Sequence, residues 1–409
     1  KLRKKIQRYN SIGIEELKEV KKVMKSGILS DFLASSGNKF LGGKKVQEFE
    51  KSICKFFKVR HAITTNSWTS GLVSAIGAMG IEPGDEVICS PWTMSASAIS
   101  IIHWNAIPIF VDINPKTFGL DLNQVKKVIN KKTKAIMSVD IFGQSDDIIE
   151  LKKIIGNRKI KIISDTAQAP GSYVGKKFSG TLADIGGYSL NYHKHINTGE
   201  GGIIVTNDAS LAKKARLIRN HAESTISKKA CKKDLINMVG YNFRLGEIES
   251  AIGIQQLKKL KKIIRYRQKL AKILINGLKN LKGLQTPIIK NNFSHVFYNF
   301  PLILQNGLED KRSLIVKTLK KKGIVGISEG YVNLHKLPMF QNKIAYGSKG
   351  YPWSTFNPKI DYKKLKLTNA EYLHEKSFFS ILLCSYDFKL HDMHNYVKAF
   401  KEVWKNLDK

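Results

Sequence analysis

One lysine of this chain lies where a lysine could do chemistry. Lys194 sits in a polar, glycine-rich stretch, residues 189–202, between two apolar runs typical of strands. Most of the other lysines interrupt helical patterns, as solvated side chains do. A lysine enclosed by a site loses its proton readily, and its neutral amine can form a Schiff base with an aldehyde. Taken alone, the segment would be interpreted as a turn with a surface lysine.

A carboxylate follows a second strand-like run. Asp165 comes directly after the apolar residues 160–164 and begins the sequence Asp-Thr-Ala-Gln, which ends at Gln168. A carboxylate at the end of a buried strand is costly unless it has a cationic partner. A protonated pyridine nitrogen would be such a partner. A helix N-cap is the alternative role for Asp165.

Hydroxyl residues occur where a third strand leads into a helix. Residues 65–71 contain Thr69 and Ser70, and a helix N-terminus with free amides and hydroxyls suits a phosphate. Capping by Ser67 or Thr69 is the simpler reading of this loop alone. Ser189, five residues before Lys194, is a further candidate for a phosphate contact.

The elements around these residues predict how they are positioned. Short apolar runs alternate with helical patterns over residues 61–164, which favours a mainly parallel sheet with helices on both faces. Ligands of such sheets gather at the carboxyl ends of the strands. Two amphipathic helices are expected within residues 11–57, and a long connecting helix over 245–281. We therefore predict a large domain over residues 1–250 and a smaller α+β domain over 251–409.

The charge of the chain needs a separate explanation. The formal net charge is +36, with 69 basic residues. Only ten of them are arginine, so 69 − 10 = 59 are lysine, and no arginine cluster with exposed aromatic residues is evident. We expect no nucleic-acid binding, although the charge would steer anionic ligands to a cleft.

Several other classes of protein are disfavoured. The most apolar stretch, residues 96–111, is interrupted by His103, Asn105 and Pro108, so no membrane insertion is expected. The four cysteines are scattered without metal-binding or redox spacing. His193 and His195 lack a third ligand, so no metal site is predicted. A reducing cytoplasm is the expected location.

Taken together, the motifs resemble the DegT/StrS family of pyridoxal-phosphate-dependent sugar aminotransferases. Asp165-x-x-Gln168 and Ser189-x4-Lys194 occur in the family's order and approximate spacing, followed by Thr-Gly-Glu-Gly-Gly at 198–202 and Tyr-Asn-Phe-Arg at 241–244. One such motif would be weak, but the ordered set is specific. The resemblance extends from Gly13 to the C-terminal helix.

The resemblance implies an aspartate aminotransferase type of α/β fold, fold type I of the pyridoxal-phosphate (PLP) enzymes, in a homodimer with shared active sites. It implies that Lys194 forms the Schiff base with PLP and that Asp165 bonds the pyridine nitrogen. The other implied contacts to PLP are Gln168 near the phenolic oxygen, Thr69, Ser70 and Ser189 at the phosphate, and Asn242 at the phosphate of the neighbouring subunit.

The implied reaction transfers an amino group, with glutamate as donor, to a nucleotide-linked keto sugar in surface polysaccharide, such as lipopolysaccharide, or glycoconjugate biosynthesis. Family members with histidine at the lysine position are dehydratases, but the spacing here places lysine at 194. A PLP-dependent dehydratase and an aminotransferase of a free keto sugar or cyclitol remain alternatives. A basic binding protein without turnover is the alternative from another class.

The chain departs from the family at two positions. Trp68 stands where glycine usually precedes the phosphate-binding threonine, and Met94 stands where an aromatic ring usually stacks on the pyridine. Met94 could pack on the ring through its sulfur, Trp92 could stack instead, or Met94 could be a core residue.

Three further residues are possible substrate contacts. His193 and His195 could lie near the substrate or be surface residues. Arg244 could hold a pyrophosphate or form a structural salt bridge.

Overall fold

The structure, a computed structural model, describes residues 6–226 and 236–407. Its larger sheet has seven strands in the order β1-β9-β8-β5-β4-β2-β3. β9 is antiparallel to both neighbours and the other pairs are parallel, which confirms the predicted mainly parallel sheet. The strands are β1 (His61–Thr65), β2 (Glu86–Cys89), β3 (Ile107–Phe110), β4 (Thr133–Val139), β5 (Lys161–Asp165), β8 (Ile185–Ser189) and β9 (Gly202–Thr206).

Helices cover both faces of this sheet, because alternate residues of its strands are apolar on each face. In β4, Ala135 and Met137 join the cluster that packs under α3, α4 and α7, while Ile136 joins the cluster under α5 and α6. A strand buried on both faces is typical of such sheets. The helices are α3 (Trp68–Ala78), α4 (Ala96–His103), α5 (Leu122–Val128), α6 (Ile148–Ile155) and α7 (Ala209–Arg219).

A second, antiparallel sheet of order β10-β11-β13-β12 forms the smaller unit. Its strands are β10 (Leu284–Gln285), β11 (Phe300–Leu304), β12 (Ile327–Glu329) and β13 (Phe378–Ile381), and it packs with α9 (Arg312–Lys321) and α13 (Leu390–Leu407). β11 begins only at Phe300, and the residues directly before it do not extend the strand. His295 Nδ1 instead accepts the amide of Phe297, whose φ of 53° is incompatible with a strand.

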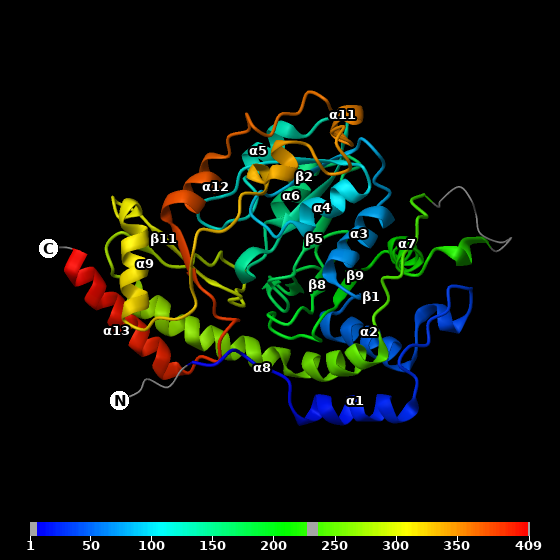
Figure 1. Ribbon diagram of the computed structural model, residues 1–409, viewed down its shortest axis with the longest axis horizontal. Helices are drawn as coiled ribbons and strands as arrows, with labels where there is room; N and C mark the ends of the chain where they lie inside the picture. Colours follow the sequence, from blue (N-terminus) through cyan, green and yellow to red (C-terminus); the bar gives the residue numbers. More distant parts are fainter. Residues whose placement is uncertain (1–5, 227–235, 408–409) are drawn as a thin grey trace.

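One long helix connects the two sheets. α8 (Glu247–Leu278) has 32 residues; it packs near its start on α1 (Ile14–Ser26) and α2 (Lys44–Phe57) and further along on α13. Figure 1 shows α8 running beneath the molecule, with α1 below it and the smaller unit at one end. The predicted connecting helix is therefore present. The domain division at residue 250 falls inside α8 and stays a prediction.

Short elements complete the described chain: a hairpin of β6 (Tyr173–Val174) and β7 (Lys177–Phe178), and the helices α10 (Pro338–Gln341), α11 (Trp353–Phe356) and α12 (Thr368–Tyr372). Sequence patterns did not predict these elements, because two to five residues are too few to show a period.

Candidate active site

Three of the predicted loops lie at one edge of the large sheet. Asp165 ends β5 and is paired with Gly187 of the adjacent β8. Ser189 ends β8 opposite Gly202, the first residue of β9, and Gly202 is also opposite Thr65, the last residue of β1. This pairing places three features side by side: Asp165, the loop after Ser189 that carries Lys194, and the N-terminus of α3.

The lysine loop, residues 190–201, is closed by its own backbone. Leu190, at the start of the loop, exchanges hydrogen bonds with the end of the loop: its amide donates to Gly201 and its carbonyl accepts from Thr198. The amide of Lys194 donates to Asn191 over 2.9 Å, which forms a tight turn at the lysine. This framework fixes the backbone from which the Lys194 side chain extends.

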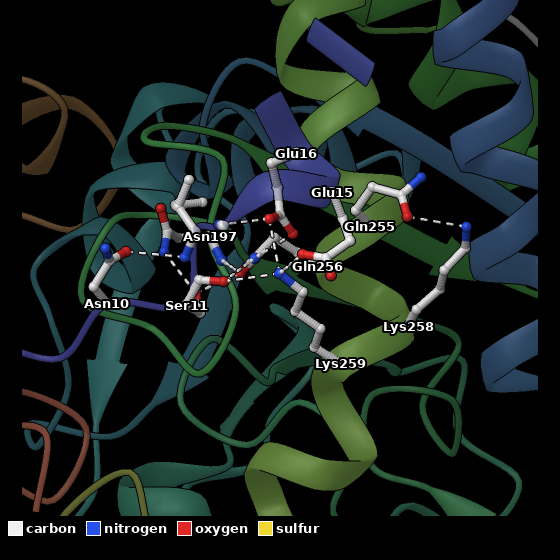
Figure 2. Close-up of polar contacts among 11 residues, drawn as sticks. Asn10, Ser11, Glu15, Glu16, Asn197, Gln255, Gln256, Lys258 and Lys259 are labelled. Carbon is white, nitrogen blue, oxygen red and sulfur yellow. Dashed lines mark hydrogen bonds and ion pairs between the residues drawn. The ribbon is translucent and has the colours of Figure 1, made fainter. Parts of the chain in front are cut away.

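A buried glutamine of α8 fastens this loop to the N-terminal segment. The Gln256 side chain is fully buried, and its Oε1 accepts from the amide of Asn197 at 3.3 Å and the hydroxyl of Ser11 at 2.6 Å. Its Nε2 donates to the Ser11 carbonyl and to Glu16, each at 2.9 Å. Figure 2 shows these groups converging between the loop, α1 and α8. Sequence reasoning missed the cluster because its members are far apart along the chain.

Lys194 is enclosed and its ammonium form is destabilised. Only 8% of the residue is exposed, and burial lowers the pKa of Lys194 from 10.5 to about 8, although the charge of Asp165 opposes this shift. Its Nζ lies 4.7 Å from the centroid of the Tyr298 ring, which comes from the smaller unit. With a pKa near 8, part of the Lys194 amine is neutral at mildly alkaline pH, and only the neutral amine is a nucleophile.

We predict that the apo protein captures an aldehyde faster as pH rises. Only the neutral amine attacks, so the capture rate should rise about tenfold per pH unit below the Lys194 pKa and level off above it. Stopped-flow absorbance after mixing with pyridoxal phosphate, at pH values from roughly 6 to 10, measures this rate. A midpoint near the ordinary lysine value of 10.5 would contradict the lowered pKa.

Asp165 is held from three directions. Its Oδ1 accepts from the indole Nε1 of Trp68 at 2.8 Å and from the amide of Ala167 at 3.2 Å. Its Oδ2 accepts from the hydroxyl of Ser97 at 2.7 Å. Asp165 is 5% exposed, and such bonds compensate the burial of a carboxylate. The N-cap role considered for Asp165 does not apply, because no helix begins there.

Gln168 is also fixed beside this edge of the sheet. Its Oε1 accepts the amide of Phe142 at 2.8 Å, and its Nε2 donates to the hydroxyl of Tyr331 at 3.1 Å. Burial raises the pKa of Tyr331 to about 12, so this phenol stays protonated at neutral pH. Tyr331 belongs to the smaller unit, so both units contribute side chains near the lysine.

The N-terminus of α3 has the features expected of a phosphate site. Ser67 is the N-cap, since its Oγ accepts the amide of Ser70 at 3.1 Å, so the capping role predicted for this loop is confirmed for Ser67. Thr69 is exposed and Ser70 is half-buried, while Ser189 is nearly buried on the neighbouring strand. The backbone of Gly202 comes so close that a Cβ there would lie 2.5 Å from the Ser67 carbonyl.

The two candidates for stacking differ in their surroundings. Trp92 is fully buried among Phe118, Phe142 and Phe378, and its Nε1 donates to Asn333. It is a core residue with no free ring face. Met94, by contrast, is 60% exposed. The interpretation of Met94 as a core residue is therefore wrong.

The two histidines that flank Lys194 are not equivalent. His195 is fully buried and its Nε2 is 2.8 Å from the Val296 carbonyl, which makes it a core residue. Burial lowers the pKa of His195 to about 3. His193 is partly exposed against Tyr192, and burial lowers the pKa of His193 to about 4, so both rings are neutral at pH 7. The expectation that His195 contacts substrate is corrected, because its ring is not accessible.

The segment that carries Asn242 and Arg244 lies against the phosphate loop. Asn66 donates its amide to Phe243 and its side chain to the Asn242 carbonyl at 3.5 Å. The Asn242 residue is exposed. Arg244 is half-buried, and its Nε donates to Asn220 at 2.8 Å while its guanidinium lies 5.8 Å from the Phe32 ring. Arg244 is thus engaged in the chain's own packing.

Comparison with known proteins identifies the family. The model of the DegT/DnrJ/EryC1/StrS aminotransferase family matches residues 11–359. The chain belongs to this family. Its members are PLP-dependent sugar aminotransferases, so the predicted family, cofactor and enzyme class are confirmed.

Similar proteins act on different sugars. The GDP-perosamine synthase of Caulobacter vibrioides is 37% identical over 284 residues, which cover 69% of this chain and 75% of that protein. The 3-oxo-glucose-6-phosphate:glutamate aminotransferase of Bacillus subtilis is 30% identical over 315 residues, 75% of this chain and 68% of that protein.

The structure of PseC from Helicobacter pylori, an aminotransferase involved in pseudoaminic acid biosynthesis, matches with a TM-score of 0.80 and 25% identity over 98% of this chain and 100% of that chain. The fold is therefore that of the fold type I aminotransferases.

The residues at the sheet edge fit PLP. A buried amine of lowered pKa suits its aldehyde, and a buried carboxylate with an acceptor position still open suits its ring nitrogen. The capped N-terminus of α3 suits its phosphate.

Other kinds of site are not seen in the part of the chain that the structure describes. Within residues 6–226 and 236–407, no three His, Cys, Asp or Glu side chains are grouped as metal ligands would be. No helix in these ranges has both the length and the apolar character needed to cross a membrane.

Proposed function

We propose that this protein transfers the amino group of glutamate to the ketone of a nucleotide-linked sugar, for surface polysaccharide or another glycoconjugate. The observation that carries the proposal is the enclosed Lys194 amine, with its pKa near 8, at the same sheet edge as Asp165 and the α3 N-terminus. A surface binding protein would gain nothing from such a costly buried lysine.

Each residue has a task in this reaction. PLP, when bound, supplies the electron sink that makes the donor's Cα–H bond labile. Lys194 Nζ would anchor the cofactor, and the same amine, when free, would accept the proton that leaves Cα of the donor. Asp165 would keep the ring nitrogen protonated, and Gln168 would serve the phenolic oxygen. Thr69, Ser70 and Ser189 would hold the phosphate, and Met94 would pack on the ring.

The electrostatics support an anionic sugar substrate. The formal charge of +36 draws anions toward the protein, and the Caulobacter relative is named for a GDP-linked sugar. His193, neutral and partly exposed next to Lys194, is our candidate for a sugar hydroxyl contact. Arg244 remains a candidate for the pyrophosphate if a substrate displaces its contact with Asn220.

The test is an amination screen. The PLP-loaded protein is incubated with ¹⁵N-glutamate and either GDP-4-keto-6-deoxymannose, a UDP-linked keto sugar or 3-oxo-glucose-6-phosphate, and the products are analysed by mass spectrometry. We expect ¹⁵N in a nucleotide-linked amino sugar. Labelling of only the sugar phosphate would overturn the nucleotide assignment. A dehydrated, unlabelled sugar would overturn transamination itself.

We also propose that the active enzyme is a homodimer in which Asn242 reaches the partner's cofactor phosphate. Two exposed side chains support the proposal that a second subunit covers the site: Met94 is 60% exposed and Tyr192 is 64% exposed. Contiguous exposed apolar surface is typical of a face that another chain covers. Asn242 is also exposed, as a side chain that contacts a neighbouring subunit would be.

A mixing experiment tests the shared site. We predict that Lys194→Ala and Asn242→Asp homodimers are each impaired, the second because its carboxylate repels the phosphate. Refolded together, the two chains should regain about a quarter of the wild-type activity, since half of the dimers then contain one intact site. Activity and the mass of the mixed species measure this. If each site were formed by one chain, mixing would restore nothing.

A further inference from the structure

The buried side chain of Trp68 has no role in the reaction proposed for this protein. It is the first residue of α3, directly after the N-cap Ser67, and it is 5% exposed. Its side chain points inward to the sheet and not toward solvent, and its Nε1 donates to Asp165. The loop expected to hold the phosphate thus also contacts the carboxylate expected to hold the ring nitrogen.

The chain makes room for this indole with two glycines. A Cβ on Gly187, which is paired with Asp165 in the sheet, would lie 2.2 Å from Cζ3 of the Trp68 ring. A Cβ on Gly71, one turn along α3, would lie 2.6 Å from its Cε3. The ring is therefore clamped between helix and sheet, and its N–H has one fixed direction.

The acceptor positions of Asp165 can be counted. A carboxylate has two oxygens with about two acceptor positions each. Oδ1 accepts from Trp68 and Ala167, so both of its positions are taken. Oδ2 accepts from Ser97 alone among the residues described, so one position remains open.

We propose that Trp68 is a positioning residue for the cofactor: by occupying Oδ1 it fixes the rotation of the Asp165 carboxylate and reserves Oδ2 for the proton of the pyridine nitrogen. The proposal rests on the proposed role of Asp165. Without the indole donor, only the Ala167 amide and the Ser97 hydroxyl restrain the carboxylate, so it turns more freely about its Cβ–Cγ bond and the alignment of Oδ2 with the ring is weakened.

The test compares Trp68→Phe with a matched variant, Trp104→Phe. Trp104 is also buried, donates its Nε1 to the Val73 carbonyl of α3 at 2.8 Å and packs on a glycine of the same helix, Gly77. Both substitutions remove one indole donor and similar volume at α3. Only the first removes a bond to Asp165.

The decisive measurement is the ¹⁵N chemical shift of ring-labelled pyridoxal phosphate bound to each variant. In Trp68→Phe we expect it to move toward the unprotonated value, with kcat for glutamate falling roughly tenfold, less than the 10² to 10³ lost with a directly contacting donor. KM should change little. In Trp104→Phe the shift and kcat should match the wild type, while its melting temperature should fall as much as that of Trp68→Phe.

Two outcomes would overturn the proposal. An unchanged shift in Trp68→Phe would make Trp68 a packing residue. A shift toward the protonated value would mean that the indole weakens the carboxylate rather than aiming it. Failure of the proposed function looks different, because wild-type protein would then bind no cofactor covalently or would not respond to glutamate.

Discussion

Replacing Lys194 with alanine is expected to remove the visible absorbance of covalently bound cofactor and to lower turnover by at least about 10⁴-fold. Both effects follow from one side chain, because Lys194 is proposed as the covalent anchor and as the base that moves the proton. Absorbance spectra of protein mixed with pyridoxal phosphate measure the first effect. Steady-state amination measures the second.

Borohydride reduction makes this result specific. It fixes a Schiff base permanently, so peptide mass spectrometry of the wild type should locate the added cofactor on Lys194. Lys177→Ala serves as the matched control, since Lys177 is an exposed lysine of the β7 strand. The control should keep the visible band and full turnover. An unchanged band in Lys194→Ala would contradict the lysine assignment.

Replacing Asp165 with asparagine is expected to lower kcat by about 10² to 10³ while the fold is retained. The amide has the size of the carboxylate, and its oxygen can still accept from Trp68. It lacks the negative charge that keeps the ring nitrogen protonated, so the electron sink is weakened. Single-turnover reaction with glutamate measures the loss.

A charged cofactor analogue separates this electrostatic role from a packing role. N-methyl pyridoxal phosphate carries a permanent positive charge on its ring nitrogen and needs no carboxylate to keep it. We expect it to restore part of the activity of Asp165→Ala, a variant with room for the methyl group, and to slow the wild type. No rescue would mean that Asp165 acts through the architecture of β5 and β8 instead.

Much of the large domain could be predicted because its strands and helices carry strong periodic patterns. The alternation of short apolar runs with amphipathic segments over residues 61–164 predicted the alternating strands and helices from β1 to β5. Asp165 and Lys194 were found for the same reason, since each follows a clear strand. The antiparallel insertion of β9 between β1 and β8 could not be read from these local patterns.

The contacts that tune the site could not be predicted in this way. Ser97 lies in the first turn of the apolar helix α4, and Tyr298 precedes a strand more than one hundred residues after Lys194, so no local spacing relates either to the site. Trp68 was visible only as a departure from the family pattern. The sequence pattern does not show the direction of the Trp68 side chain, because packing against Gly71 and Gly187 determines it.

The contacts of Gln256 with Ser11 and with the lysine loop have a practical consequence when this chain is shortened or extended at its start. Ser11 supplies both a hydroxyl and a carbonyl to Gln256, and the same amide side chain holds Asn197 of the lysine loop. Trimming the chain past Ser11, or fusing a bulky tag directly before it, would remove or distort the support beneath that loop. An affinity tag after the terminal helix α13 avoids this cost, and inactivity of a trimmed enzyme should not be mistaken for a lack of catalytic residues.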